Sequence, residues 1–285
     1  MNPSYPLMFL AVFLFALNSC LTRLFQVKQQ KKAEGLFLYQ ACFCLTASVL
    51  FFCIGRQLAK PLLPAVLFGL FFAAAIFCSA KCCEIGSMSL TSIIINLSLL
   101  VPLLYSWFFL NESVLPRSII GCVLLSATFV LSSGASRKER YSNWWLLLVV
   151  IGFAANGTTA VVQKQQQLLQ ANSGAFLGTA YLVSAIVIAI LFFVKKGNQQ
   201  TTHLVQSLPK TVAYSLLSGF GSFAGNGLLM YLSTKINGGV LYPVINGGLC
   251  LVCSAVSFLV FREKPTRQKA AAILTGLAAI VLLCL

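Results

Sequence analysis

Apolar runs of about twenty residues fill most of this chain, and their length limits its possible folds more than any other feature. About 20 apolar residues span a bilayer as one α-helix, whereas a strand of a membrane barrel shows about ten residues of alternating polarity. Hydrophobic residues make up 59% of the chain and charged residues 9%. Roughly half and a quarter are typical of a soluble domain. The sequence therefore predicts an all-α membrane protein.

Ten such runs can be delimited, with short polar connectors between them. The predicted spans are 6–22, 36–54, 62–80, 90–110 and 118–133, followed by 144–162, 175–194, 212–233, 240–261 and 270–285. The charged segment 136–143 separates the fifth span from the sixth. We therefore expect a first five-helix unit at 1–135, a linker at 136–143 and a second five-helix unit at 144–285.

The two units resemble each other in sequence. When Ile85 is aligned with Ile236, Glu112 falls on Glu263, and each Glu stands in a short charged turn after an apolar run. A second alignment places the amide of Asn18 on that of Asn156. Because each unit has an odd number of spans, the second unit must enter the membrane from the opposite side. The predicted fold is therefore ten transmembrane helices in two inverted five-helix repeats, with a substrate site between them near the bilayer midplane.

The distribution of Lys and Arg predicts the orientation. Fifteen of the twenty basic residues fall on one side of the predicted spans. The other side holds Arg56, Lys60, Arg117, Lys164 and Lys235. Since basic loops stay in the cytoplasm, both termini are expected outside a cell membrane, which we take to be a bacterial cytoplasmic membrane. The net charge of +15 is thus a topology signal, and no nucleic-acid partner is predicted.

The repeated turn resembles a known family. Phe109-Leu110-Asn111-Glu112 followed by Arg117 and Gly121 is similar to the repeat of the drug/metabolite transporter superfamily, in its ten-helix EamA-like branch. The segment 259–264 with Gly276 resembles the same signature again. The resemblance extends over the whole chain and implies a metabolite or drug carrier with a central cavity. It also implies that the last helix of each half lies at the periphery.

Two features differ from what the resemblance implies. Members of this branch usually have cytoplasmic termini, whereas the charge distribution favours termini outside. The similar small multidrug resistance proteins use a Glu in the first helix for proton exchange, and the first span here has none. All acidic residues lie in connectors or at span ends, namely Glu34, Glu84, Glu112, Glu139 and Glu263. Proton antiport is therefore less expected than facilitated diffusion or exchange.

Neutral polar residues inside the spans are the candidates for substrate binding. They are Asn18, Gln40, Ser92, Asn96, Asn156, Asn226, Tyr242 and Asn246. Several form pairs four residues apart and so share one helix face. An unpaired amide in hydrocarbon costs several kcal/mol, so these faces must turn inward. They either line a cavity or join helices through hydrogen bonds.

Glycine and proline mark possible gating positions. Gly221 and Gly225 have the small-xxx-small spacing that allows helices to approach closely, and they could either bend the eighth span or only pack it. Pro102 and Pro243 interrupt the fourth and ninth spans and are expected to kink them.

The predicted function is a secondary transporter that works by alternating access. Its substrate should be a small neutral, zwitterionic or weakly cationic metabolite or drug, since the predicted spans hold no Lys or Arg at depth for an anion. A non-transporting scaffold or sensor and a passive channel are the alternatives. We predict no enzyme activity, no metal and no cofactor, because the chain lacks Asp and its eleven Cys form no ligand pattern. The expected partners are the substrate and the lipid bilayer, with the protein a monomer or homodimer.

Overall fold

The structure is a computed structural model, which describes residues 5–28, 33–85, 91, 94–95, 97–111, 116–132, 142–169, 172–196, 202–259 and 267–284. These residues form ten α-helices and one 3-10 helix, with no strand among them. In chain order the elements are α1 (Tyr5–Lys28), α2 (Ala33–Gly55), α3 (Leu62–Ile85), η1 (Leu97–Leu99), α5 (Leu100–Phe109), α6 (Pro116–Ser132), α7 (Asn143–Leu168), α8 (Ser173–Lys196), α9 (Thr202–Leu232), α10 (Gly238–Leu259) and α11 (Arg267–Cys284). Each predicted span overlaps a helix of the described part of the chain, so the prediction of an all-α fold with ten helices is confirmed. That all ten cross a membrane as two inverted repeats stays a prediction.

Five of the described helices are long and apolar enough to cross a membrane. The segments are Tyr5–Thr22, Gly35–Gly55, Leu62–Cys82, Asn143–Leu168 and Ser173–Val194. Many large apolar side chains point outward from the bundle, including Phe13, Phe108 and Val194, which are 60%, 74% and 76% exposed. Such an outer surface suits contact with lipid.

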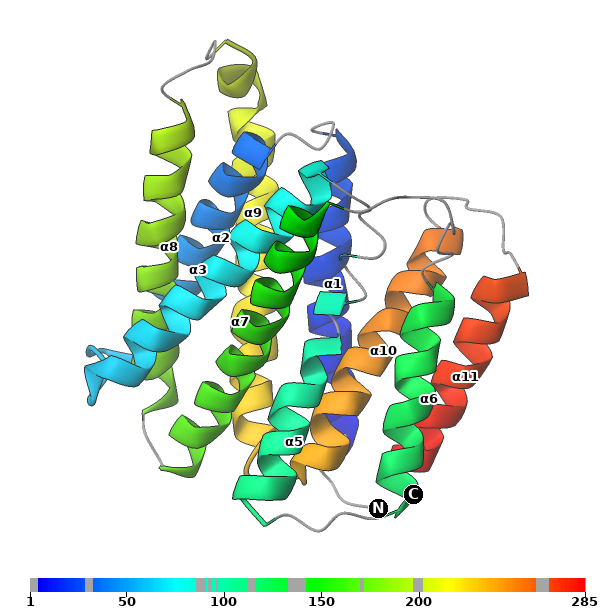
Figure 1. Cartoon of the computed structure of the whole chain (residues 1–285). Coiled ribbons are helices and arrows are strands. Elements are labelled where there is room, and N and C mark those ends of the chain that lie inside the picture. The colour runs from blue at the N-terminus through cyan, green and yellow to red at the C-terminus, as the bar shows by residue number, and fades with distance from the viewer. Residues whose placement is uncertain are drawn as a thin grey trace.

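The helices form one elongated bundle (Figure 1). α2 packs against α8 and α9, α3 packs against α7 and α8, and α1 packs against α9 and α10. α6 and α11 lie together at one edge of the bundle, where Thr128 and Thr275 share a hydrogen bond of 3.0 Å. The Tyr5 end of α1 and the Cys284 end of α11 lie at the same end of the molecule. α1 and α7 run in opposite directions, as do α6 and α11 (Figure 1).

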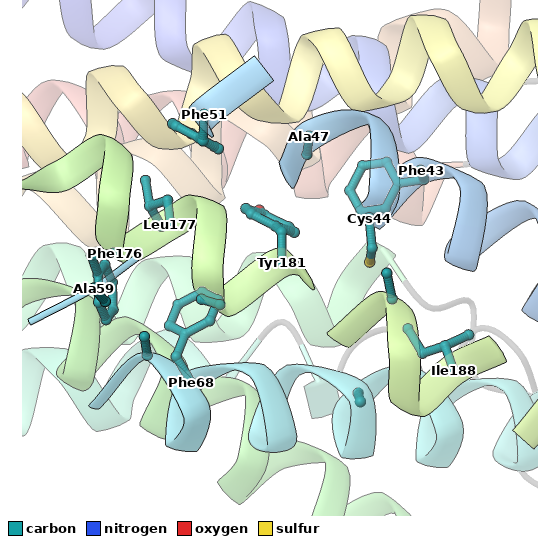
Figure 2. Packing of buried hydrophobic residues seen from close by; sticks show 14 of the residues in the cluster. Phe43, Cys44, Ala47, Phe51, Ala59, Phe68, Phe176, Leu177, Tyr181 and Ile188 are labelled. Carbon is teal, nitrogen blue, oxygen red and sulfur yellow. The ribbon is translucent and has the colours of Figure 1, made fainter. Parts of the chain in front are cut away.

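Two large apolar clusters fill the bundle. One lies around α2, α3 and α8, where the ring of Tyr181 lies among those of Phe43, Phe51 and Phe68 (Figure 2). Its centroid is 5.5 to 6.3 Å from these three rings and from the ring of Phe72. The other joins α1, α5, α6, α10 and α11. α9 contributes to both clusters through Met230 and Leu229, so it connects the two parts of the bundle.

Glycines bring α2 and α8 into backbone contact. A Cβ atom on Gly55 would lie 2.3 Å from the Ala175 nitrogen, and one on Gly174 would lie 2.7 Å from the Gly55 nitrogen. No larger residue fits at either position without moving a backbone. Ser48 Oγ donates to the Gly178 carbonyl over 2.8 Å, and the Ala59 N–H donates to Thr179 Oγ1 over 3.0 Å. This contact joins a helix of the first half of the chain to a helix of the second half, and it combines close backbone packing with hydrogen bonds.

α7 is longer than the sequence predicted. It begins after Ser142, whose side chain accepts a hydrogen bond from the Trp144 N–H, and it continues through Gln163 and Lys164 to Leu168. The predicted span ended at residue 162 because the following residues are polar. Gln and Lys are good helix formers, so polarity alone does not end a helix. The extension moves Lys164 from a predicted connector into the bundle.

Candidate functional site

One face of α9 carries a row of polar side chains. Ser218, Ser222 and Asn226 are spaced four residues apart, which places them on the same side of the helix. Asn226 Nδ2 lies 3.1 Å from Ser222 Oγ, so these two positions on one face are joined by a direct hydrogen bond. The row faces α2 and α8, because tyrosines of those helices reach it.

Tyr181 of α8 reaches the end of this row that lies nearer the C-terminus of α9. Its hydroxyl lies 2.9 Å from Ser222 Oγ and accepts a hydrogen bond of 2.9 Å from Asn226 Nδ2. The side chain is 1% exposed, and its ring lies in the aromatic shell of Figure 2. The rigid shell fixes the hydroxyl against α9. From α7, Gln163 Nε2 donates to the backbone carbonyl of Asn226 over 3.3 Å.

Tyr39 of α2 reaches Ser218, the residue of this row that lies nearest the N-terminus of α9. Its hydroxyl is hydrogen-bonded to Ser218 Oγ and lies 3.2 Å from Thr22 Oγ1 of α1. The ring stacks on Phe25 with centroids 4.6 Å apart. We call these two hydrogen-bonded groups, which share one face of α9, the polar tract, and it consists of Thr22, Tyr39, Gln163, Tyr181, Ser218, Ser222 and Asn226. The tract contains only neutral side chains and has members from both halves of the chain.

A separate hydrogen bond joins η1 to α7. Asn156 Nδ2 donates to Ser98 Oγ over 2.6 Å. A Cβ atom on the neighbouring Gly157 would lie 3.1 Å from the Ser98 carbonyl oxygen of η1 and 2.5 Å from Val101 Cγ2 of α5, so α7 is in close contact with both elements. Asn156 therefore points towards the fourth helix of the first half.

Lys164 is buried, contrary to the sequence prediction. Its side chain is 1% exposed, and Nζ donates to Ser106 Oγ of α5 over 2.9 Å. Nζ also lies 5.9 Å from the centroid of the Tyr242 ring of α10. The prediction that Lys164 belongs to a connector is wrong, because α7 extends past it. Anionic substrates were not expected because the predicted spans hold no Lys or Arg at depth. The burial of Lys164 removes that reason.

The structure places the other predicted binding residues as follows. Asn18 of α1 and Gln40 of α2 are partly buried, and Asn18 Cβ lies 4.0 Å from where a Cβ on Gly221 would be. Tyr242 is buried, and Asn246 Nδ2 donates to the Tyr242 carbonyl one turn earlier over 3.0 Å. Ser92 and Asn96 lie outside the described residues. The eight candidates are thus distributed over several contacts, and their role in binding stays a prediction.

The predicted gating glycines lie where α9 crosses α1. A Cβ on Gly221 would lie 3.3 Å from the Leu14 carbonyl oxygen, and one on Gly225 would lie 3.2 Å from the Phe15 ring. α9 is continuous through both positions. This geometry accounts for their small size by close packing, and the gating role stays a prediction.

The two prolines differ in their surroundings. Pro102 is buried in the first turn of α5, directly after the 3-10 turn η1, where its missing N–H costs no helix hydrogen bond. Pro243 lies inside α10. Beyond it, Gly247 and Gly248 pack against Leu125 of α6 and Val12 of α1, because Cβ atoms there would lie 2.4 and 2.8 Å from those side chains. These glycines therefore serve helix packing.

The sequence analysis did not identify several residues of the site. Tyr39 and Tyr181 lie in apolar runs, where a tyrosine is interpreted as part of the hydrophobic face. Gln163, Lys164 and Ser106 stand near span ends, where polar residues read as connectors. The helical periodicity of α7 continues into the Gln-rich segment, and this pattern is the signal that could have identified Lys164 as a helix residue. No group of three or more His, Cys, Asp or Glu side chains that could hold a metal occurs within the described part of the chain.

Comparison with known proteins agrees with this architecture. A solved structure named only "Crystal structure of protein" superposes with a TM-score of 0.74 at 14% identity, and the match covers 95% of each chain. At that identity the likeness concerns the fold alone. None of the curated proteins compared with the chain matches it. The family model described as "EamA-like transporter family" matches residues 143–285, half of the chain. The protein is therefore a member of the EamA-like transporter family and a multi-pass membrane protein of the drug/metabolite transporter type.

Proposed function

We propose that the protein is a secondary transporter that moves a small neutral, zwitterionic or weakly cationic metabolite or drug by alternating access. The two five-helix halves would be inverted repeats that rock about a site between them. Family membership supports transport, and the opposite directions of α1 and α7 and of α6 and α11 support the inverted arrangement (Figure 1). We propose no covalent chemistry, and the protein acts as a monomer or homodimer.

The observation that carries the proposal is the polar tract. Hydroxyl and amide groups are costly inside an apolar bundle, and they are retained where they bind each other or a ligand. Tyr39 belongs to the first half, whereas Ser218, Ser222 and Asn226 belong to the second. A solute entering between the halves can exchange hydrogen bonds with such groups, since hydroxyls and amides both donate and accept.

The hydrogen bonds divide into two classes that suggest how the halves move. Those of Tyr181 with Ser222 and Asn226 lie within the second half and can persist when it moves as a body. Those between Tyr39 and Ser218 and between Ser98 and Asn156 cross from one half to the other. These two crossing bonds are the ones that we propose a rocking motion breaks and a solute replaces, whereas the bonds of Ser48 and Ala59 to α8, which also cross, hold α2 against α8.

Transport by purified protein in liposomes tests the proposal. A panel of labelled neutral and zwitterionic solutes is offered with and without a pH gradient. We expect saturable uptake of at least one solute, with little dependence on the gradient, because the polar tract contains no titratable carboxylate or His. Flux that requires the gradient contradicts the proposed coupling, and flux that does not saturate indicates a channel.

A non-transporting scaffold or sensor is the second candidate. It is favoured by the hydrogen bonds of Asn156 and Asn226 to neighbouring helices, which are the kind that hold a static bundle together. Cysteine placed at Asn18 or Asn246 separates the two functions. Labelling of these positions by a small polar thiol reagent supports the transporter, and complete protection of both supports the scaffold.

A further inference from the structure

Two successive residues near the end of α7 are bonded to two successive residues of α5. Lys164 Nζ donates to Ser106 Oγ over 2.9 Å, and Gln165 Nε2 donates to the Tyr105 hydroxyl over 2.9 Å. α5 belongs to the first half of the chain and α7 to the second, so both bonds cross between the halves. We call these four residues the α5–α7 clasp.

The α5–α7 clasp can open without repacking the helices. Its bonds are made by the ends of side chains, whereas Gly55 and Gly174 bring α2 and α8 into backbone contact. Gln165 is exposed and Tyr105 only partly buried, so water can take the place of either partner when their bond breaks. A hydrogen bond that water can replace contributes little net free energy. This end of the bundle is therefore held more weakly than the contact between α2 and α8.

A second connection between the halves lies further along the bundle. The hydroxyl of Tyr39 on α2 is hydrogen-bonded to Ser218 Oγ on α9 and lies 3.2 Å from Thr22 Oγ1 on α1. α1 and α2 belong to the first half and α9 to the second. We call Thr22, Tyr39 and Ser218 the α2–α9 clasp. Each hydroxyl can both donate and accept, so each can bind water or a solute in place of its partner.

The two clasps lie at different levels of the bundle. Ser106 and Lys164 lie about one turn from the ends of α5 and α7, at the end of the bundle that also holds Tyr5 (Figure 1). Thr22 lies more than about four turns beyond Tyr5 along α1. At about 5.4 Å per turn, the α2–α9 clasp is roughly 15 to 20 Å further along the bundle than the α5–α7 clasp.

The hydrogen-bonded residues Tyr181, Ser222 and Asn226, which we call the central group, lie between the two clasps. Along α9, Ser222 follows Ser218 of the α2–α9 clasp by one turn, and Asn226 follows by another. The Asn226 carbonyl accepts a hydrogen bond from Gln163, the residue that precedes the α5–α7 clasp on α7. A solute bound at the central group would therefore have one clasp on each side.

We propose that the two clasps are the gates of the transporter, the α5–α7 clasp at the end that holds Tyr5 and the α2–α9 clasp towards the other end. This inference rests on the transporter function proposed above. Opening one clasp gives water and solute access to the central group from that side only. The arrangement described here, with both clasps formed, is then the occluded state, and the two clasps open in turn, since opening both together would make a leak.

A purely structural role for these bonds makes a different prediction. If the clasps only hold a static bundle together, breaking one lowers the stability of the protein and exposes the central group to neither side. If they are gates, breaking one exposes the central group to a single side. Access to the central group from each side therefore separates the two roles.

A thiol between the clasps can report which of them opens. In protein whose native cysteines are replaced, Ser222→Cys places a thiol in the central group. Ser222 is 2% exposed, so a small membrane-impermeant thiosulfonate should reach this thiol only through an opened clasp. The reagent is added to intact cells and to inside-out vesicles. Lys235→Cys, exposed in the turn at the Tyr5 end, shows which preparation presents that side (Figure 1). The labelling rate is proportional to the open fraction, so even a rare opening is detected.

Three substitutions, each combined with Ser222→Cys, break the clasps. Tyr105→Phe removes the hydroxyl that accepts from Gln165 and keeps the ring, which stacks on Phe109 with centroids 5.2 Å apart. Ser106→Ala removes the acceptor of Lys164. Tyr39→Phe breaks the α2–α9 clasp and keeps the ring.

Matched controls remove the same groups elsewhere. Tyr231→Phe removes a tyrosine hydroxyl from an exposed position, and Ser126→Ala removes a hydroxyl that bonds the Cys122 carbonyl within α6. Size-exclusion chromatography checks folding of every variant. If Ser106→Ala aggregates, Tyr105→Phe alone tests the α5–α7 clasp.

We expect Tyr105→Phe and Ser106→Ala each to raise the labelling rate from the Tyr5 side about three-fold or more, the effect of one hydrogen bond between membrane helices. Neither should raise the rate from the other side. Tyr39→Phe should have the reverse effect, and the controls should change neither rate.

Three results overturn the gates: a thiol that never reacts, rates that the clasp substitutions leave unchanged, and rates that rise from both sides at once. The liposome assay shows whether the carrier falls with them. If liposomes take up a solute with saturation, the carrier stands and its gates lie elsewhere. If they transport no solute of any class, the carrier itself fails.

Discussion

The amide of Asn156 on α7 donates to the hydroxyl of Ser98 on η1 over 2.6 Å. The two residues come from different halves of the chain, and η1 is the 3-10 turn that precedes Pro102. The bond therefore fixes an irregular segment of one half against a regular helix of the other.

A double-mutant cycle can measure this bond. We expect Asn156→Ala and Ser98→Ala to show a coupling energy of about 0.6 kcal/mol, and no more than about 1.7, the range found for hydrogen bonds between membrane helices. Unfolding in mixed detergent gives the free energies. As a control, Asn156→Ala is combined with Ser126→Ala, whose hydroxyl bonds the Cys122 carbonyl within α6. Additivity within about 0.5 kcal/mol is expected for that pair, and equal coupling in both cycles would contradict the bond.

Tyr181→Phe should destabilise the protein while keeping its aromatic packing. The change removes the hydroxyl that bonds Ser222 and Asn226, so we expect a loss of about 1 to 2 kcal/mol in the free energy of unfolding. Tyr231→Phe is the matched control, because Tyr231 is 49% exposed. The apparent melting temperature in detergent compares the two variants. A Tyr181→Phe protein as stable as the control would show that the buried hydroxyl contributes nothing.

Alanine at two glycines of α9 should have opposite effects. A Cβ on Gly219 would lie 2.6 Å from Thr46 Cβ, whereas one on Gly227 would find its nearest neighbour, in Phe51, at 3.9 Å. Gly219→Ala must push α9 from α2 and should cost about 1 to 3 kcal/mol. Gly227→Ala should stabilise by up to about 1 kcal/mol, since alanine is the better helix former. Melting temperatures should rank Gly227→Ala above the unmodified protein and Gly219→Ala below it; the reverse order would refute the packing described for α9.

Cysteine labelling tests the arrangement in the membrane. Lys60 and Lys235 are exposed in the turns after α2 and α9, at the end of the bundle that also holds the Tyr5 end of α1 (Figure 1). With the eleven native cysteines replaced, Lys60→Cys and Lys235→Cys should both react with a membrane-impermeant maleimide on intact cells. The charge distribution predicts this outer location. Reaction of both only after permeabilisation reverses the orientation, and opposite behaviour of the two contradicts the fold.

The helices could be predicted because their signal is local. Each apolar run is long enough to be recognised alone, and α2 lies close to its predicted range at both ends. Helix ends were less certain, since α7 continues through polar residues whose helix propensity is high. For the same reason the burial of Lys164 could not be predicted. A lysine that follows an apolar run is interpreted as a connector residue unless the packing of α5 and α10 is known.

The site depends on contacts between distant residues, which sequence patterns express only in part. Ser222 and Asn226 could be placed on one face because they are four residues apart. Their partner Tyr181 comes from another helix, and nothing in its own surroundings in the sequence distinguishes it from a core aromatic. For Gly225 the sequence pattern allowed two interpretations, because its spacing is compatible with both bending and close packing of the helix. The neighbouring Phe15 ring, which is known only from the structure, accounts for the small size of this residue.

The backbone contact between Gly55 and Gly174 also limits how the molecule can deform. Two helices that touch without intervening side chains cannot approach further, and the hydrogen bonds of Ser48 and Thr179 oppose their separation. A rigid-body rotation of one half against the other would have its axis near this point. Displacements would then grow with distance from α2 and α8 and be largest around α6 and α11, so spin labels on that remote pair would record the widest excursions.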